Sequence, residues 1–106
     1  MELLTKELER RFTAVGRQET LGDKAIVVAK YFTPGCQWTW YATEYDPETR
    51  LFFGLVDGFE AELGYFSLDE MEAVTSPMGL AMERDLHWKE VTLSEVKTAL
   101  STGNRL

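Results

Sequence analysis

The first residues of the chain place apolar side chains at helical spacing. Leu8, Phe12 and Val15 recur three or four positions apart, which puts them on one face of a helix. Thr5 precedes the run and offers a side-chain oxygen to the free backbone N–H groups of a first turn. Gly16 follows it and favours termination. The pattern predicts an amphipathic helix between Thr5 and Gly16.

Short apolar runs separated by turn residues follow. Runs dense in β-branched and aromatic residues predict strands at 25–32, about 38–45, 51–56 and 62–66. Turn-forming residues lie between these runs, and the short Pro-containing turn at 46–49 predicts an antiparallel hairpin between the second and third strands.

The last third of the chain predicts two helices. Ser-x-x-Glu at 67–70 and Thr-x-x-Glu at 92–95 are capping-box patterns, so we expect helices that end near residues 73 and 103. An edge strand or extended segment is predicted at 80–88. The order of elements predicts a single α+β domain over residues 1–106. It has an antiparallel meander of about four strands, with the N-terminal helix and two C-terminal helices packed on one face.

The segment 38–45 is the most aromatic part of the chain, with two Trp and two Tyr in eight residues. Strict alternation along a strand places Trp38 and Trp40 on one face and Tyr41 and Tyr45 on the other. One pair is expected in the core and the other against a helix or a protein, and the pattern leaves open which pair is buried. Exposed aromatic rings can stack bases. The acidic surroundings repel phosphates, so direct nucleic-acid binding is not expected.

Acidic residues are concentrated in the middle of the chain. The formal charge is −7, but residues 43–83 contain ten acidic residues and one basic residue, so this segment is −9 and the remainder is +2. Such a field attracts basic surfaces, including the grooves of nucleic-acid-binding proteins, although solubility alone also explains an acidic surface. The candidate partner-binding residues are Glu44, Asp46, Glu48, Asp57, Glu60, Glu62, Asp69, Glu70 and Glu72.

Residues with catalytic or metal-binding chemistry are sparse. In a strand at 80–88, Glu83, Asp85 and His87 would point to one side and could hold a divalent metal. A solvated edge strand explains the same residues more simply. Cys36 and His87 would form a thiol–imidazole pair only if the fold brought them together. No Gly-rich phosphate loop or zinc spacing is present. We therefore expect no enzyme activity, metal or cofactor.

The sequence shows neither a membrane span nor a signal-peptide pattern, which predicts a cytoplasmic protein. No window approaches the ~18 to 20 consecutive apolar residues of a membrane span, and segment 1–11 mixes acidic and basic residues, unlike a signal peptide. Cys36 is the only cysteine, which excludes an internal disulfide and suits a reducing compartment. No membrane partner is expected.

Several motifs in order along the chain carry a family resemblance: LLTKEL at 3–8, KYFTP at 30–34, WTWYATE at 38–44, LFFGLV at 51–56, ELGYFSL at 62–68 and ERDLH at 83–87. They resemble a family of small acidic bacterial proteins catalogued as a domain of unknown function, typical of plasmids, conjugative elements and prophages. In length and character the chain is also similar to a type II-A anti-CRISPR protein of that family.

The resemblance implies an inhibitor of a type II CRISPR–Cas nuclease. The acidic run from Glu44 to Glu72 adds the hypothesis that the protein occupies a basic surface of the nuclease and competes with DNA, partly by mimicking its phosphate charges. Two alternatives stay open. One is a regulatory or interaction protein of a conjugative element, and the other is a small metal-dependent enzyme that uses His87.

Overall fold

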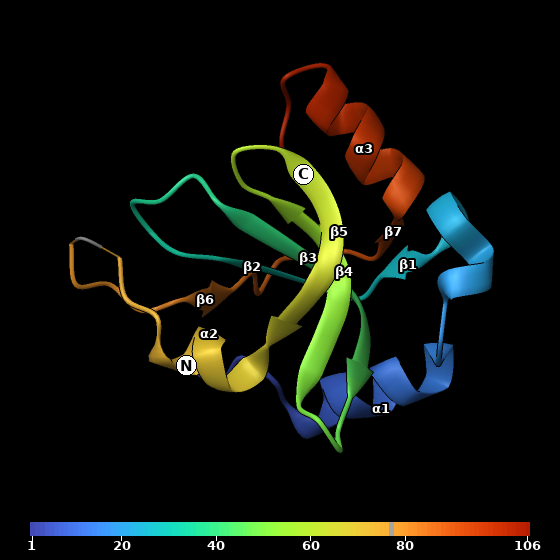
Figure 1. Ribbon diagram of the computed structural model, residues 1–106, viewed down its shortest axis with the longest axis horizontal. Coiled ribbons are helices and arrows are strands. Elements are labelled where there is room, and N and C mark those ends of the chain that lie inside the picture. Colours follow the sequence, from blue (N-terminus) through green and yellow to red (C-terminus); the bar gives the residue numbers. More distant parts are fainter. Residues whose placement is uncertain (77) are drawn as a thin grey trace.

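A five-stranded antiparallel sheet forms the centre of the computed structural model, which describes residues 1–76 and 78–106. Along the chain (Figure 1), the elements are α1 (Lys6–Val15), the 3-10 helix η1 (Glu19–Lys24), β1 (Ile26–Val27), β2 (Ala29–Phe32), β3 (Thr39–Asp46), β4 (Leu51–Asp57), β5 (Ala61–Ser67), α2 (Leu68–Ala73), β6 (Glu83–Arg84), β7 (Val91–Thr92) and α3 (Leu93–Ser101). The strand order is β5-β4-β3-β2-β6, and β1 pairs with β7 in a separate two-stranded sheet. The α+β class with an antiparallel sheet is confirmed, with five strands where about four were expected.

The helices begin where local sequence patterns place them. The Thr5 side chain accepts a hydrogen bond from the backbone N–H of Leu8 at 3.1 Å, and α1 ends at Gly16, whose φ of +61° suits glycine. Ser67 caps α2. Thr92 and Glu95 form a complete capping box at the start of α3. These caps satisfy backbone groups within a few residues of themselves, so the sequence alone predicts them.

The strand expected at 25–32 is divided in two. Residues 26–27 pair with β7, and only 29–32 remain in the large sheet. The buried side chain of Gln18 is one reason. It donates to the backbone oxygens of Ile26 (2.9 Å) and Thr43 (2.6 Å) and accepts from the N–H of Ile26 (2.7 Å). These bonds hold the chain at the point where β1 leaves the sheet.

A β-bulge changes which face of the sheet the aromatic side chains of β3 point to. The register of β3 against β4 shifts between Ala42 and Glu44, so Thr43 is the extra residue. Tyr45 therefore packs on the same core cluster as Trp40, while Tyr41 is fully buried in the other cluster. The expected pairing of Tyr41 with Tyr45 on one face is wrong, because the prediction assumed unbroken alternation.

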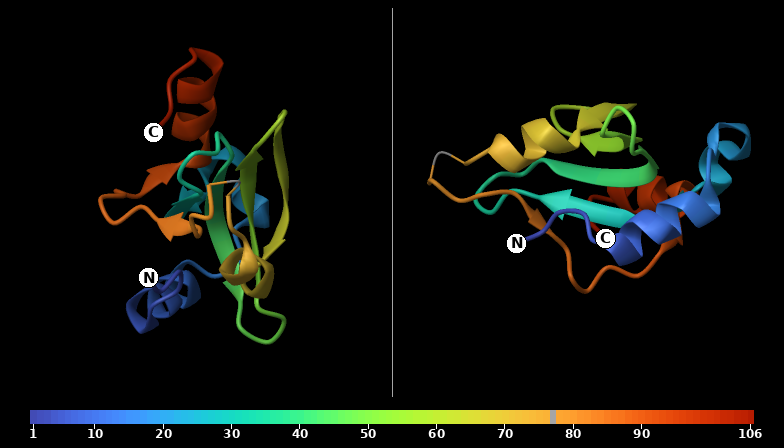
Figure 2. Two further views of the ribbon diagram at one scale, coloured as in Figure 1. Left: turned by 90° about the vertical axis from the view of Figure 1, so that its left-hand side faces the viewer. Right: turned by 90° about the horizontal axis from the view of Figure 1, so that it is seen from below.

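Both faces of the sheet carry a core. On one face, Phe52 contacts the rings of Phe12 from α1 and Tyr31 from β2 at centroid distances of 5.7 and 5.4 Å. On the other face, a second cluster joins Tyr41 and Leu55 to the buried side of α3. The helices therefore do not all cover one face, and α1 and α3 lie at opposite ends of the molecule (Figures 1 and 2).

The segment 80–88 forms a much shorter strand than predicted. Glu83–Arg84 pairs with β2 as β6 at the edge of the sheet, and Ala81 forms an isolated bridge with Thr75. The backbone then turns, because the Asp85 side chain accepts the N–H of His87 at 2.9 Å. The regular alternation that would have aligned Glu83, Asp85 and His87 therefore ends at Arg84.

Candidate functional site

The fold separates the predicted acidic residues into groups at the two ends of the β4–β5 hairpin. Asp57, Glu60 and Glu62 lie at the end where β4 turns into β5. The carboxylates of α2 and of the β3–β4 turn lie at the opposite end, because Leu51 pairs with Ser67 there. A seven-residue strand spans about 20 Å, so the sheet does not bring the two groups together.

Arg50 neutralises part of the group beside α2. Its guanidinium lies 2.8 Å from Asp69 and 3.1 Å from Glu72. The hydrogen bond to Asp69 is the main cause of the raised pKa of Arg50. At the other end of the hairpin, Arg105 pairs with Asp57 at 3.3 Å.

The other six predicted carboxylates make no ion pair within the part of the chain that the structure describes. Two of them have local roles: Glu44 accepts the backbone N–H of Gln18 at 2.9 Å, and Asp46 accepts that of Glu48 at 2.9 Å. The remaining four are exposed and form no side-chain hydrogen bond among the described residues: Glu48, Glu60, Glu62 and Glu70.

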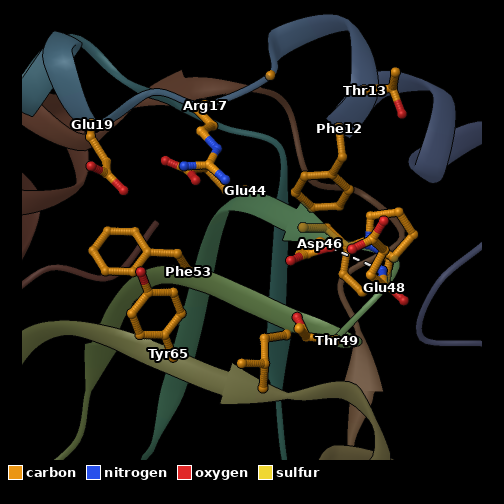
Figure 3. Close-up of a pocket in the computed structure, with 14 residues that line it drawn as sticks. Phe12, Thr13, Arg17, Glu19, Glu44, Asp46, Glu48, Thr49, Phe53 and Tyr65 are labelled. Atoms are coloured by element: carbon orange, nitrogen blue, oxygen red, sulfur yellow. Dashed lines mark hydrogen bonds between the residues drawn. The ribbon is translucent and has the colours of Figure 1, made fainter.

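A cleft of about 510 Å³ lies between the C-terminal end of α1 and the β3–β4 hairpin (Figure 3). Phe53 and Tyr65 are cross-strand partners that line it, and their rings meet edge to face at 5.0 Å. Four carboxylates and one cation also line the cleft: Glu19, Glu44, Asp46, Glu48 and Arg17. Ring faces and carboxylates both attract Lys and Arg side chains, so the cleft suits a basic surface.

The sequence pointed to the acidic residues of this cleft but missed its aromatic lining. Phe53 and Tyr65 were assigned only to strands, and Arg17 and Glu19 belonged to no predicted site. Alternation along β4 does place the side chain of Phe53 on the face of the sheet opposite to that of the buried Phe52. Whether that face is covered depends on where α3 packs, and the sequence pattern does not show this.

A second exposed aromatic group lies at the tip of the β4–β5 hairpin. Phe59 is 96% exposed, and its ring meets Trp38 edge to face at 5.3 Å. Trp38 covers Gly58 so closely that a Cβ there would lie 2.8 Å from the indole ring. Trp38 also lies near Trp40, with a centroid distance of 6.1 Å. Trp38 and Trp40 therefore lie together as predicted, but both are only partly buried, and Trp40 packs against the core cluster that contains Phe52.

The residues considered as metal ligands, Glu83, Asp85 and His87, make contacts of other kinds. Asp85 lies 3.7 Å from Lys30 and holds the turn that precedes the exposed His87. Among residues 1–76 and 78–106, no group of three or more His, Cys, Asp or Glu side chains is arranged to hold a metal ion. Cys36 is exposed in the loop before β3.

No helix in the described ranges is both long and apolar enough to span a bilayer. Comparison with curated proteins finds no match, and comparison with solved structures finds none either. A family model does match, under the description "Protein of unknown function (DUF2958)", and its match extends over residues 3–104. With nearly its whole length covered by that model, the chain belongs to the DUF2958 family.

Proposed function

We propose that this protein binds and inhibits a type II CRISPR–Cas nuclease through its exposed carboxylates, in competition with DNA. The observation that carries the proposal is the pair Glu60 and Glu62, exposed on the β4–β5 hairpin with no ion pair among the described residues. A nuclease of this class holds its guide–target duplex in a positively charged channel. Carboxylates fixed on a strand can occupy such a channel in place of phosphates.

The hairpin tip holds fewer carboxylates than the α2 end, but it combines the exposed Glu60 and Glu62 with an exposed aromatic ring, which makes it the stronger candidate for a protein contact. Each end has one arginine in ion pairs among the described residues, Arg105 at the tip and Arg50 beside α2. Phe59 at the same tip adds exposed apolar surface, which strengthens protein–protein contacts. The family resemblance of the sequence supplies the class of partner, and the charge distribution supplies the mode of binding.

The direct test titrates the purified protein into guide-loaded type II nuclease with labelled target DNA. We expect DNA binding and cleavage to fall as the protein approaches stoichiometry, and inhibition to weaken as salt screens the charges. Full DNA binding and cleavage at saturating protein would contradict the proposal. So would affinity purification from a host with a type II system that returned a conjugative-element protein and no nuclease.

Charge reversal then tests the mode of binding. In the double variant Glu60→Lys and Glu62→Lys, we expect inhibition to be lost, because both changes place cations against a basic channel. The control variant, Glu2→Lys with Glu7→Lys, changes the net charge equally at the N-terminal end of the chain, where both residues are exposed. If both variants inhibit like the parent, an apolar surface rather than charge makes the contact.

A further inference from the structure

Strand β5 forms one complete edge of the five-stranded sheet. It is seven residues long, whereas β6 at the other edge has only two. Figure 2 shows β5 and β6 on opposite sides of the sheet. β5 contains no proline or lysine, two residues that commonly block pairing at sheet edges. This edge therefore has the length and composition to accept another strand.

The outward-facing backbone groups of β5 follow from its ladder with β4. Hydrogen bonds flank the ladder at both ends: the N–H of Gly58 donates to the oxygen of Glu60 at 3.1 Å, and that of Leu68 donates to the oxygen of Arg50 at 3.0 Å. Hydrogen-bonded pairs alternate in an antiparallel ladder, so the N–H and C=O groups of the even-numbered residues of β5 point toward β4. The odd-numbered residues direct their N–H and C=O groups toward the open edge.

Side chains on the same odd-numbered positions are apolar and exposed. Leu63 is 50% exposed and Tyr65 is 67% exposed. They lie beside Leu55 and Phe53 of β4, their cross-strand partners, so an added strand would cover a row of apolar groups two strands wide. The backbone donors and the apolar row thus belong to the same residues.

The charges around β5 indicate which kind of protein segment can pair with it. Glu60 and Glu62 lie at its start, and α2 follows directly with further carboxylates. A second copy of this chain pairing antiparallel would bring Glu60 and Glu62 of each copy against the α2 carboxylates of the other. A parallel copy would align Glu62 with Glu62. Like charges meet in both arrangements, although Arg50 offsets part of the α2 charge in the antiparallel one. The charges therefore disfavour self-pairing and favour a basic partner.

We propose that β5 binds an extended segment of a basic partner protein as a sixth, antiparallel strand. The segment places apolar side chains opposite Leu63 and Tyr65 and Lys or Arg side chains near the carboxylates at both ends of β5. Main-chain hydrogen bonds supply affinity, and the alternating side chains supply specificity. The proposal goes beyond inhibition of a nuclease, because it specifies the form of the bound segment whatever protein carries it.

The test uses the capped synthetic peptide Arg-Thr-Val-Thr-Ile-Lys-Arg, whose Val and Ile fall opposite Tyr65 and Leu63. NMR hydrogen exchange is measured for the whole protein with and without peptide. At ten times the dissociation constant about 90% of the protein is bound, so exchange at the amides of Leu63 and Tyr65 should slow about tenfold. Even-numbered amides of β5, which already bond to β4, should change much less.

Two control peptides separate strand addition from general charge attraction. The first is N-methylated at Val and Ile, which removes the donors that face β5 but keeps every charge, and we expect its binding to be lost. The second replaces the three basic residues with Glu and should also fail to bind. The proposal is overturned if the parent peptide does not bind, if the N-methylated peptide binds equally well, or if the acidic peptide does.

A protein variant tests the same bond from the other side. Leu63→Pro removes an outward N–H and leaves the β4 ladder intact, so peptide binding should weaken at least about tenfold. The matched variant Leu63→Ala keeps the N–H and should weaken binding less. Circular dichroism checks that both variants are folded, and a folded Leu63→Pro protein that binds like the parent overturns the proposal. If Leu63→Pro does not fold, the exchange data and the N-methylated peptide decide.

Discussion

Strands β4 and β5 pair along their whole length, yet their surroundings are opposite. Phe52 and Leu55 of β4 are buried in the cores on the two faces of the sheet. On β5 only Phe66 is buried, and Leu63 and Tyr65 remain exposed. The two strands have equal length but different environments. The inner strand β4 joins the two cores, whereas the edge strand β5 leaves backbone groups and side chains available for a partner.

The largest predicted effect compares two glycines that face each other across these strands. A Cβ at Gly54 would lie 1.9 Å from the backbone oxygen of Tyr41, whereas a Cβ at Gly64 meets nothing within 4 Å. Gly54→Ala should cost at least about 3 kcal/mol or prevent folding, because backbone cannot move aside cheaply. Gly64→Ala should stabilise the fold by about 0.5 kcal/mol.

Urea unfolding followed by tryptophan fluorescence measures both glycine variants. Equal stability of the two would show that β3 and β4 are not as closely packed as described. It would remove the main physical difference between the inner and edge strands.

The second comparison is between one buried and one exposed aromatic ring. Phe52 contacts the rings of Phe12, Tyr31, Tyr45 and Phe66, so Phe52→Ala should cost about 3 kcal/mol. Tyr65→Ala loses mainly the edge-to-face contact with Phe53 and should cost no more than about 1 kcal/mol. Thermal unfolding by circular dichroism measures the difference, and a cost for Tyr65→Ala near that of Phe52→Ala would contradict an exposed edge.

Alkaline pH should weaken the inner part of the sheet. Burial raises the pKa of Tyr41 to about 12, while Arg105 lowers it and Asp57 raises it to a smaller extent. An unfolded tyrosine ionises near pH 10. The contribution of the neutral Tyr41 side chain to the free energy of unfolding is therefore complete below pH 10 and is lost as pH rises toward 12. The loss is on the order of 2 kcal/mol. Urea unfolding from pH 9 to 12 should show a shallower decline in Tyr41→Phe than in the parent, and parallel declines would contradict the assignment.

The smallest effects concern two buried hydroxyls in the inner strands. The Tyr31 hydroxyl donates to the backbone oxygen of Leu3 at 2.7 Å, whereas the buried Tyr41 hydroxyl has no partner among the described residues. Tyr31→Phe should cost about 1 kcal/mol, and Tyr41→Phe should be neutral or stabilising at pH 7. Denaturant midpoints at neutral pH measure both, and a clear loss in Tyr41→Phe would reveal an unrecognised partner for its hydroxyl.

Much of the fold could be predicted because it depends on neighbours in sequence. The caps at Thr5 and Thr92 and the turn at 46–49 act over three or four residues, and the predicted strands overlap every strand of the described residues except β7. The predictions failed for two different reasons. The Gln18 amide divides the strand at 25–32 through a contact with Thr43, which is distant in sequence. The strand at 80–88 is shortened by a local turn, held by Asp85, that the alternation of residue types does not show.

The candidate site was predictable only as a set of residue types. The sequence by itself determined the concentration of carboxylates in residues 43–83 and the family to which the chain belongs. The tertiary structure decided that these carboxylates separate to two ends of a hairpin, that Arg50 pairs with two of them, and that the bulge at Thr43 places Tyr45 and Tyr41 in different cores. The physical reason is that charge and capping are properties of residues and their nearest neighbours. Exposure, pairing and the face of a strand depend on contacts between segments that only the folded chain brings together.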